Sequence, residues 1–383
     1  MQRILSLWLL LSIAACHSSS EEKADHNTNA SGTTAPTTTQ HAQGFDITYE
    51  KGYKLVSVFH PFVDQPDTLQ YVLLTSAASL PPSLQALPQI TLPVKRMVIL
   101  STTHLGFLAA LQSTEVIVGM AGTEYVYHPT IRQRVQMKQI ASLNEQGLDE
   151  EAILALDPQL VMVSGMPQSD LGKYQKLIDL GIPVVINAEW LEDSPLGKAE
   201  WIKFMAAFLD KESVVNTYFE EIEEAYTTLL DKTKVIPSKE RKSVLSGVAY
   251  QGNWYIPGGK SFMAHFFEDA AAIYPWQNLP ESGSVPLSLE AVYNKALDTE
   301  VWLNVGNATS LEALEQLDER YGDFKAFQNG EVYNRTKRVH INGGNDYWEA
   351  GVVQPHLILA DLIKILYPSL LPDHELYFYE KLP

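Results

Sequence analysis

Short apolar stretches alternate with amphipathic ones through the first half of the chain, and this alternation most constrains the fold. Four apolar runs are typical of strands: residues 96–100, 116–122, 160–165 and 183–190. The segments between them carry apolar residues at helical spacing, which predicts intervening helices. Strands that are apolar throughout are buried on both faces, so we predict a parallel sheet with helices covering either side.

The alternation stops at one long helical segment, residues 211–234. Its apolar residues recur at helical spacing and comprise Val215, Tyr218, Phe219, Ile222, Tyr226 and Leu229. A helix of this length spans about 30 Å or more, and its charged opposite face indicates a surface position. The alternation then resumes, with strands predicted at 243–250, 301–306 and 331–334. We therefore predict an α/β fold of two lobes with central parallel sheets, joined by a single long α-helix.

These patterns also predict the domain organisation. The N-terminal lobe comprises residues 44–210 and opens with a β-rich segment of unassigned role, 211–234 is the interlobe helix, and 235–383 form the C-terminal lobe. With 45% hydrophobic residues, a chain of 383 residues can build two cores. Its net charge of −18 lacks the basic face that phosphate backbones require, so we expect no nucleic-acid partner.

The N-terminus has the features of a targeting segment. Arg3 precedes an apolar run of about ten residues, which suits a signal peptide and is too short to span a membrane. The run ends in Ile-Ala-Ala-Cys, which is similar to the lipobox of bacterial lipoproteins, and Cys16 is the only cysteine. We predict a signal peptide over 1–16, lipidation of Cys16, and a flexible tether over 17–43 that anchors the protein in the cell envelope. A free or buried thiol is the alternative.

Large aromatic side chains with polar neighbours follow several predicted strands. Ligands of open α/β sheets bind beyond the carboxyl ends of the strands, and two such ends facing each other would form a cleft. Buried aromatic rings contribute about 1–3 kcal/mol each to binding. We predict that the ligand is bound by Tyr125, Tyr127, Glu189, Trp190, Trp254, Tyr255, Asn345, Asp346, Tyr347 and Trp348. The alternative is that these rings plug the interface or pack loops onto their own lobes.

A second interpretation places a metal site at the same loops. His104 and His128 are possible ligands, and Glu189 and Asp346 are a possible carboxylate pair across the cleft. This arrangement would suit a metal-dependent enzyme or a metallochaperone. However, the chain has no phosphate-loop, nucleophile-elbow, His-Glu-x-x-His or dinucleotide motif, so we favour binding over catalysis.

Four stretches carry a resemblance to a known family. They are "VKRMVILSTTHLGFLAAL", "LDEEAILALDPQLVMVSG", "YIPGGKSFMAHFFEDAAA" and "SVPLSLEAV". They resemble segments of the class III periplasmic binding proteins, the substrate-binding lipoproteins of ABC importers for iron–siderophore complexes and vitamin B12. The second stretch contains the family's most recognisable motif, and the resemblance runs from about residue 94 to residue 366.

The resemblance implies how such a protein meets its partners. One acidic residue on each lobe engages the permease, and the matching positions here are Glu151 and Glu290. The alternative is that both are ordinary first-turn glutamates favoured by the helix dipole. Because family members bind a metal that is already chelated, we expect no cofactor and no metal ion bound directly by the protein. Aromatic rings would stack on the chelator or corrin ring, and Asn345 and Asp346 would hydrogen-bond its rim.

The resulting hypothesis is a monomeric, lipid-anchored solute-binding protein that is not an enzyme. It captures an iron–siderophore complex between the lobes and delivers it to an ABC permease and its ATPase. A corrinoid such as vitamin B12 is the second candidate ligand, and haem is the third. A surface lipoprotein that captures its ligand without a permease is a further alternative. The stiff interlobe helix predicts only modest closure on binding.

Overall fold

The computed structural model describes residues 36–62, 67–76, 79–144, 149–165 and 171–383. The predicted signal peptide, Cys16 and most of the predicted tether lie outside these residues, so lipidation remains a prediction. Within the described ranges, no helix combines the length and the apolar character needed to cross a membrane.

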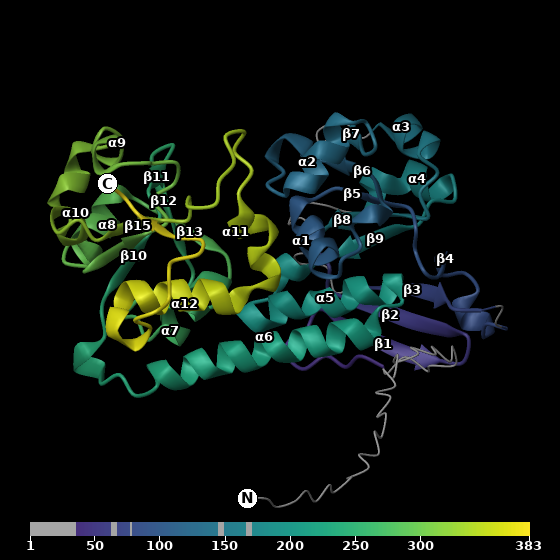
Figure 1. Ribbon diagram of the computed structural model, residues 1–383, viewed down its shortest axis with the longest axis horizontal. Coiled ribbons are helices and arrows are strands. Elements are labelled where there is room, and N and C mark those ends of the chain that lie inside the picture. The colour runs from purple at the N-terminus through teal and green to yellow at the C-terminus, as the bar shows by residue number, and fades with distance from the viewer. Residues whose placement is uncertain (1–35, 63–66, 77–78, 145–148, 166–170) are drawn as a thin grey trace, which may run out of the picture. The chain divides into compact units, whose positions relative to one another are not determined.

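The N-terminal lobe contains the predicted parallel sheet, with strand order β7-β6-β5-β8-β9 (Figure 1). Its strands are β5 (Met97–Ile99), β6 (Ile117–Ala121), β7 (Ala141–Leu143), β8 (Leu160–Ser164) and β9 (Val184–Asn187). Its helices are α1 (Thr102–Ala110), α2 (Pro129–Gln136), α3 (Glu150–Ala155), α4 (Gln175–Asp179) and α5 (Pro195–Leu209). Every side chain of β5 and β9 is buried, as expected for strands covered on both faces.

The β-rich opening segment forms a separate four-stranded sheet in the order β1-β2-β3-β4. The strands are β1 (Phe45–Glu50), β2 (Tyr53–Phe59), β3 (Thr68–Leu74) and β4 (Gln89–Thr91), and only β4 pairs in parallel. Alternate side chains of β1 and β2 point into the N-terminal core. The ring of Phe45 lies 4.8 Å from Trp201 of α5. This sheet is therefore part of the N-terminal lobe.

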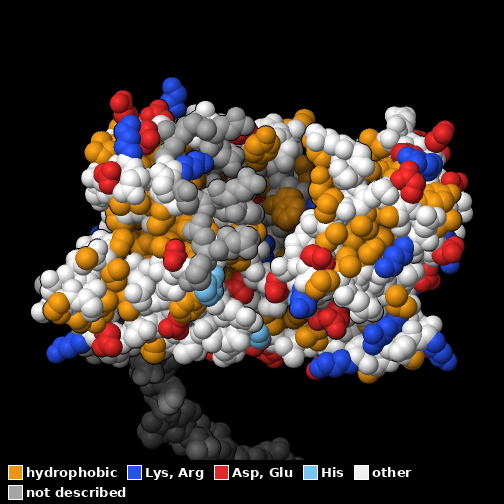
Figure 2. All heavy atoms as spheres, turned by 180° about the vertical axis from the view of Figure 1, so that it is seen from behind, with side chains coloured by type: hydrophobic (Ala, Val, Ile, Leu, Met, Phe, Trp, Pro, Cys, Tyr) orange, Lys and Arg blue, Asp and Glu red, His pale blue; other side chains and the backbone are white. Residues whose placement is uncertain are grey.

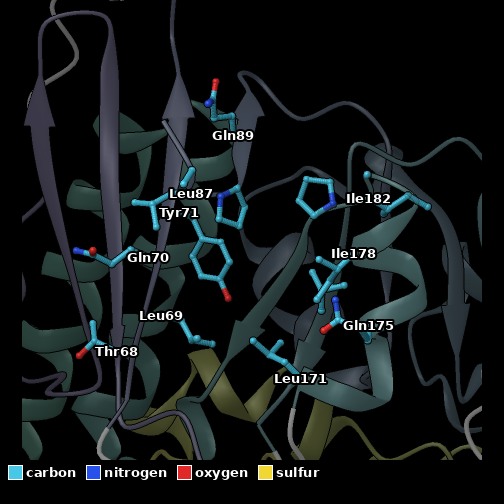
Figure 3. A pocket seen from close by; sticks show the side chains of 15 residues that line it. Thr68, Leu69, Gln70, Tyr71, Leu87, Gln89, Leu171, Gln175, Ile178 and Ile182 are labelled. Atoms are coloured by element: carbon cyan, nitrogen blue, oxygen red, sulfur yellow. The ribbon is translucent and has the colours of Figure 1, made fainter. Parts of the chain in front are cut away.

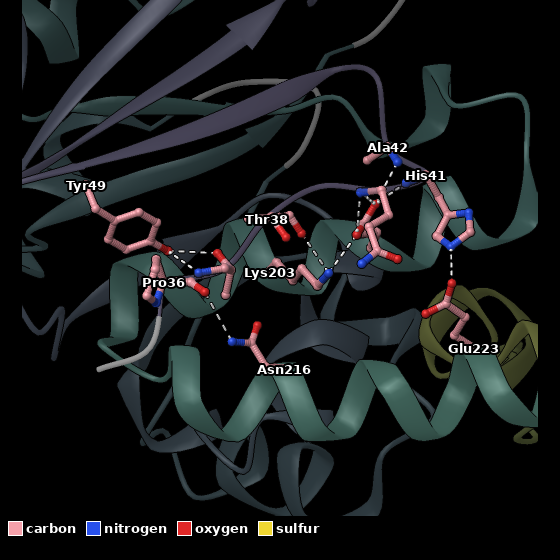
Figure 4. Close-up of polar contacts among 11 residues, drawn as sticks. Pro36, Thr38, His41, Ala42, Tyr49, Lys203, Asn216 and Glu223 are labelled. Carbon is pink, nitrogen blue, oxygen red and sulfur yellow. Dashed lines mark hydrogen bonds and ion pairs between the residues drawn. The ribbon is translucent and has the colours of Figure 1, made fainter. Parts of the chain in front are cut away.

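Residues 36–43 differ from the predicted flexible tether, because they are bound along α5 and α6 (Figure 4). The fully buried carboxylate of Glu200 accepts the backbone N–H groups of Gln40, His41 and Ala42 at 2.7–3.0 Å. A buried carboxylate needs such donors to offset its loss of hydration. The Nε2 atom of His41 also lies 2.7 Å from a carboxyl oxygen of Glu223 on α6.

The long helix α6 (Glu212–Thr233) coincides with the predicted interlobe helix and contributes to both hydrophobic cores. Val215 and Phe219 belong to the N-terminal core. Ile222, Tyr226 and Leu229 belong to the C-terminal core. The helix therefore joins the two lobes, as the fold prediction required.

The C-terminal lobe contains two sheets, of which one is mostly parallel. Its order is β10-β14-β15-β16, built from β10 (Val244–Ser246), β14 (Val301–Leu303), β15 (Val332–Asn334) and the antiparallel β16 (Glu380–Lys381). The second sheet is antiparallel and comprises β11 (Ala249–Tyr250), β12 (Asn253–Pro257) and β13 (Ser284–Leu287). The helices are α7 (Phe262–Asp269), α8 (Leu289–Ala296), α9 (Leu311–Glu315), α10 (Lys325–Gln328), α11 (Asp346–Glu349) and α12 (Pro355–Leu366).

The predicted strand 243–250 is wrong in one respect, because it is split between the two sheets. β10 ends at Ser246, and Ala249 begins a hairpin whose two-residue turn is Gln251-Gly252. Both turn residues have positive φ, 49° and 84°, as a tight two-residue hairpin turn requires. The segment after the turn is thus a strand rather than the predicted ligand-binding loop.

Candidate functional site: the cleft between the lobes

The carboxyl ends of the N-terminal strands carry polar side chains, as predicted. α1 follows β5 directly, and the Ser101 hydroxyl accepts the N–H of Thr103 at 3.2 Å, which caps the helix. Thr103 in turn hydrogen-bonds the carboxyl group of Glu189, which follows β9. At the end of β8, the hydroxyl oxygen of Ser164 lies 3.4 Å from Nε2 of His104.

Glu189 lies beneath this surface rather than on it. Its side chain is only 2% exposed, and among the described residues its Oε2 atom has no hydrogen-bond partner. Burial raises the pKa of the Glu189 carboxyl, and the nearby Lys198 opposes that shift. The Glu189 carboxyl group is therefore not exposed to the cleft in this structure.

The C-terminal lobe provides the main cavity, of about 290 Å³. Ser246 ends β10, Asn304 follows β14 and Arg335 follows β15, so three adjacent parallel strands present polar groups at their carboxyl ends. The amide of Asn304 donates to the Ser246 hydroxyl at 3.0 Å, and this bond fixes both side chains. The rings of Tyr255, Phe262 and Trp348 complete this wall.

A smaller cavity of about 20 Å³ shares Phe262 and Trp348 with the first and is lined from both lobes. Thr103 contributes from α1, Lys198 from α5 and Tyr347 from α11. Figure 2 shows that the molecule is hollowed between its two lobes, with hydrophobic side chains at the bottom of the hollow. We call the two cavities together the interlobe cleft.

Three of the predicted ligand residues meet in the interlobe cleft. Tyr255 and Trp348 are 46% and 47% exposed and line its wall, and Tyr347 lies at its floor. Trp190 is half-buried and does not line either cavity of the cleft. The other predicted residues are placed differently, for reasons that the local structure explains.

Trp254 contradicts the prediction, because it is fully buried in the C-terminal core. Its ring stacks on Trp302 at 5.6 Å, and its indole N–H donates to the Ser246 carbonyl at 2.9 Å. The cause is the period-two alternation of β12, which sends Trp254 inward and its neighbour Tyr255 outward.

The aromatic and glycine-rich stretch 341–351 forms a second contact between the lobes. A methyl group at Gly344 would lie 2.6 Å from the carbonyl oxygen of Tyr125, so only glycine allows this approach. The carboxylate of Glu349 accepts the backbone N–H groups of Tyr127 and His128, each at 2.9 Å. We call this contact of residues 338–349 with residues 125–128 the interlobe latch.

The latch also engages the two polar residues that were predicted to hydrogen-bond the chelator. Asp346 is 5% exposed and forms an ion pair with Arg338 at 2.6 Å. Arg338 in turn lies 5.2 Å from the ring centre of Tyr127. Asn345 caps α11 and donates to the backbone of Arg335 at 3.0 Å. The predictions for Asn345 and Asp346 are therefore wrong, since both side chains are already bound to groups of their own lobe, Asn345 to the Arg335 and Tyr347 backbone and Asp346 to Arg338.

The alternative metal site does not form among the described residues. No group of three or more His, Cys, Asp or Glu side chains is placed there to hold a metal ion. His104 is fully buried, and that burial lowers its pKa to about 3. Asp346 is paired with Arg338.

Both predicted docking glutamates are exposed near the first turns of their helices. Glu151 lies in α3 and Glu290 in α8. The Glu290 carboxyl is 3.2 Å from Arg320, an exposed ion pair that water screens and that contributes little to stability. Both side chains are therefore available to a partner.

The cleft residues that the sequence prediction missed include Lys198, Phe262 and Arg335. Arg335 follows a parallel strand, so the rule that pointed to the other loops also applies to it. Lys198 and Phe262 lie on helices and follow no strand of the predicted sheets directly, so the rule for strand ends does not reach them.

A larger cavity of about 570 Å³ lies elsewhere, between β3, β4 and α4 (Figure 3). Leu69, Tyr71 and Ile178 are among its apolar lining residues, and no lining residue is charged. It borders the amino end of β9, at Val184, whereas ligands of parallel sheets bind beyond the carboxyl ends. We therefore assign the functional site to the smaller interlobe cleft.

Comparison with known proteins identifies the family of this chain. The sequence profile of the periplasmic binding proteins matches residues 97–339, and the chain belongs to this family. Its two lobes joined by one long helix are the class III fold, as the resemblance implied. An uncharacterized lipoprotein of Methanocaldococcus jannaschii is 28% identical over 301 residues, which are 76% of this chain and 70% of that protein.

Solved structures share the fold at low sequence identity. A possible iron-binding periplasmic solute-binding protein of Staphylococcus epidermidis is 16% identical with a TM-score of 0.56, covering 72% of this chain and 99% of its own. A periplasmic heme-binding protein of Pseudomonas aeruginosa is 16% identical with a TM-score of 0.55, covering 72% of this chain and 94% of its own. The chain is thus a solute-binding protein of the type that serves ABC importers.

Proposed function

We propose that this protein captures an iron–siderophore complex in the interlobe cleft and delivers it to an ABC permease without chemical change. The supporting observation is the composition of the cleft wall, where the rings of Tyr255, Phe262 and Trp348 occur together with serine hydroxyls and the amide of Asn304. Rings offer flat contact area to a chelator, and hydroxyls hydrogen-bond its rim. The likeness to iron-binding and heme-binding proteins supports a metal chelate as cargo.

Tryptophan fluorescence tests the ligand class. A ferric siderophore that enters the cleft should quench Trp348, so titration with ferric siderophores, cobalamin and haem identifies the ligand. Trp348→Phe should remove most of the quenching, whereas Trp276→Phe, a buried ring outside the cleft, should retain it. Tight binding of cobalamin or haem with no response to any ferric siderophore would contradict the siderophore assignment.

Delivery to a permease rests on Glu151 and Glu290. We propose that these exposed carboxylates bind basic pockets of the permease, one from each lobe, with α6 setting their separation. Substituting both by alanine should abolish uptake in cells and leave ligand affinity in vitro unchanged. Normal uptake by the double variant would favour a capture lipoprotein that acts without a permease.

The proposed lipid anchor at Cys16 is tested by labelling cells with radioactive palmitate. The wild-type protein should incorporate the label and fractionate with membranes, while Cys16→Ser should do neither. Equal labelling of both proteins would contradict the proposal.

Closure on binding should be modest, because α6 and the interlobe latch both connect the lobes. Solution scattering with and without the ligand should show a small decrease in the radius of gyration. A large contraction would contradict this proposal.

A further inference from the structure

The interlobe cleft contains two cations, Arg335 and Lys198, that have no carboxylate in direct contact among the described residues. Arg335 lines the larger cavity and Lys198 the smaller one, and none of the residues lining either cavity is Asp or Glu. Within the part of the chain that the structure describes, neither cation forms an ion pair within 4 Å. The protein as a whole has a net charge of −18, whereas the charged side chains that line the cleft are positive.

Arg335 is held in place by aromatic rings. Its guanidinium carbon lies 4.2 Å from the ring centre of Trp348 and 5.0 Å from that of Tyr347. Cation–π contact fixes the plane of the group and leaves donors directed away from the rings. Ser246 and Ser284 line the same cavity and supply further hydrogen-bonding groups. A guanidinium group held in this way can donate two parallel hydrogen bonds to a pair of negatively charged oxygens.

Lys198 reaches the cleft floor from α5, and its ammonium lies 4.7 Å from the ring centre of Phe262. Burial lowers the pKa of Lys198, and the charge of Glu189 partly opposes that shift. The ammonium is therefore partly removed from water without a carboxylate in contact. The absence of a contacting anion makes this position costly for the free protein.

We propose that the cargo is an anionic metal chelate, whose carboxylate or catecholate oxygens bind Arg335 and whose remaining negative charge is stabilised by Lys198. This inference rests on the proposed function and narrows it. An anion entering the cleft supplies a contacting partner for Arg335 and adds to the effect of Glu189 on Lys198. An uncharged complex would instead cover Arg335 and Lys198 without compensating them, so it should bind less tightly.

Two classes of ferric siderophore differ in net charge and therefore test the charge preference of the cleft. Three singly charged hydroxamates balance Fe(III), whereas three doubly charged catecholates leave a net negative complex. The wild-type protein should bind a ferric tricatecholate siderophore at least tenfold more tightly than a ferric trihydroxamate, and added salt should reduce this preference.

Arg335→Gln should weaken tricatecholate binding about ten- to hundredfold, the range of one charge-assisted hydrogen bond. Arg335→Lys keeps the charge, so its affinity for the tricatecholate should lie between those of the wild type and Arg335→Gln. Lys198→Met should give a smaller loss. Lys239→Gln removes one exposed positive charge outside the cleft and should change nothing. Unfolding midpoints close to wild type would show that each variant is folded.

The outcomes distinguish this inference from the proposed function. Equal binding of both ferric complexes, unaffected by Arg335→Gln, would overturn the charge proposal and leave the siderophore function standing. Binding of haem alone, lost in Arg335→Gln, would support an anionic cargo and overturn the siderophore assignment. No binding of any metal chelate would overturn both.

Discussion

Two of the contacts that join the lobes differ in their chemistry. α6 joins them through buried apolar surface, with Phe219 in one core and Tyr226 in the other, 1% and 2% exposed. The interlobe latch joins them through polar groups, among which the Glu349 carboxylate accepts two backbone N–H groups of the other lobe. Buried apolar side chains do not titrate, whereas the Glu349 carboxyl does, and burial raises its pKa to about 7. We therefore expect the latch to respond to pH through Glu349.

The largest effect is expected from α6 itself. Phe219→Ala removes a fully packed ring from the N-terminal core and should lower the free energy of unfolding by about 3–5 kcal/mol. Denaturant unfolding monitored by circular dichroism measures this change. Val214→Ala, on the exposed side of the same helix, should change stability by less than about 0.5 kcal/mol. Equal losses of unfolding free energy in the two variants would show that the packing of Phe219 does not stabilise the contact of α6 with the N-terminal core.

An intermediate effect is expected at the latch. Glu349→Ala leaves the N–H groups of Tyr127 and His128 without their acceptor, at a cost of about 1–3 kcal/mol. Hydrogen exchange at these two amides should become faster, while exchange in β5 and β8 should not change. Unchanged protection of both amides would contradict the assignment of Glu349 as the latch acceptor.

The latch should also give stability a pH dependence. The folded-state pKa of Glu349 is about 7 and its ordinary value is 4.5, so between these values the folded state binds more protons than the unfolded state. Stability contributed by this group therefore falls as the pH rises from about 4.5 to about 7, by at most about 1.4 kcal/mol per pH unit. Glu349→Gln should flatten this part of the profile. The exposed α6 variant Glu221→Gln is the matched control, and a wild-type slope in Glu349→Gln would contradict the prediction.

The smallest effect is expected where residues 36–43 contact α6. The His41–Glu223 pair is 28% and 31% exposed, and such pairs contribute about 0.2–1 kcal/mol. His41→Gln should therefore shift the unfolding midpoint only slightly. Glu200→Ala, which removes the buried acceptor of three backbone N–H groups, should cost more and make this segment sensitive to proteolysis. A larger loss in His41→Gln than in Glu200→Ala would contradict this order.

Local sequence was sufficient to predict the helices and strands whose pattern of buried residues depends on near neighbours in the chain. The apolar strands and the period of α6 depend on residues a few positions apart, and the structure has both. The exposed rings of Tyr255 and Trp348 also lie in the cleft as expected. Trp254 was misplaced because the two-residue turn before it was not recognised, and that turn sets which face of β12 it occupies.

The sequence by itself determined two α/β lobes and their connecting helix, because periodicity of burial is a local property of the chain. Only the tertiary structure decided which polar groups remain for a ligand. Asp346 and Glu349 find their partners in the latch and Asn345 binds the Arg335 backbone, while the side chains of Arg335 and Lys198 line the cleft. Pairing of charges depends on distances between residues far apart in the chain, and no local pattern encodes those distances.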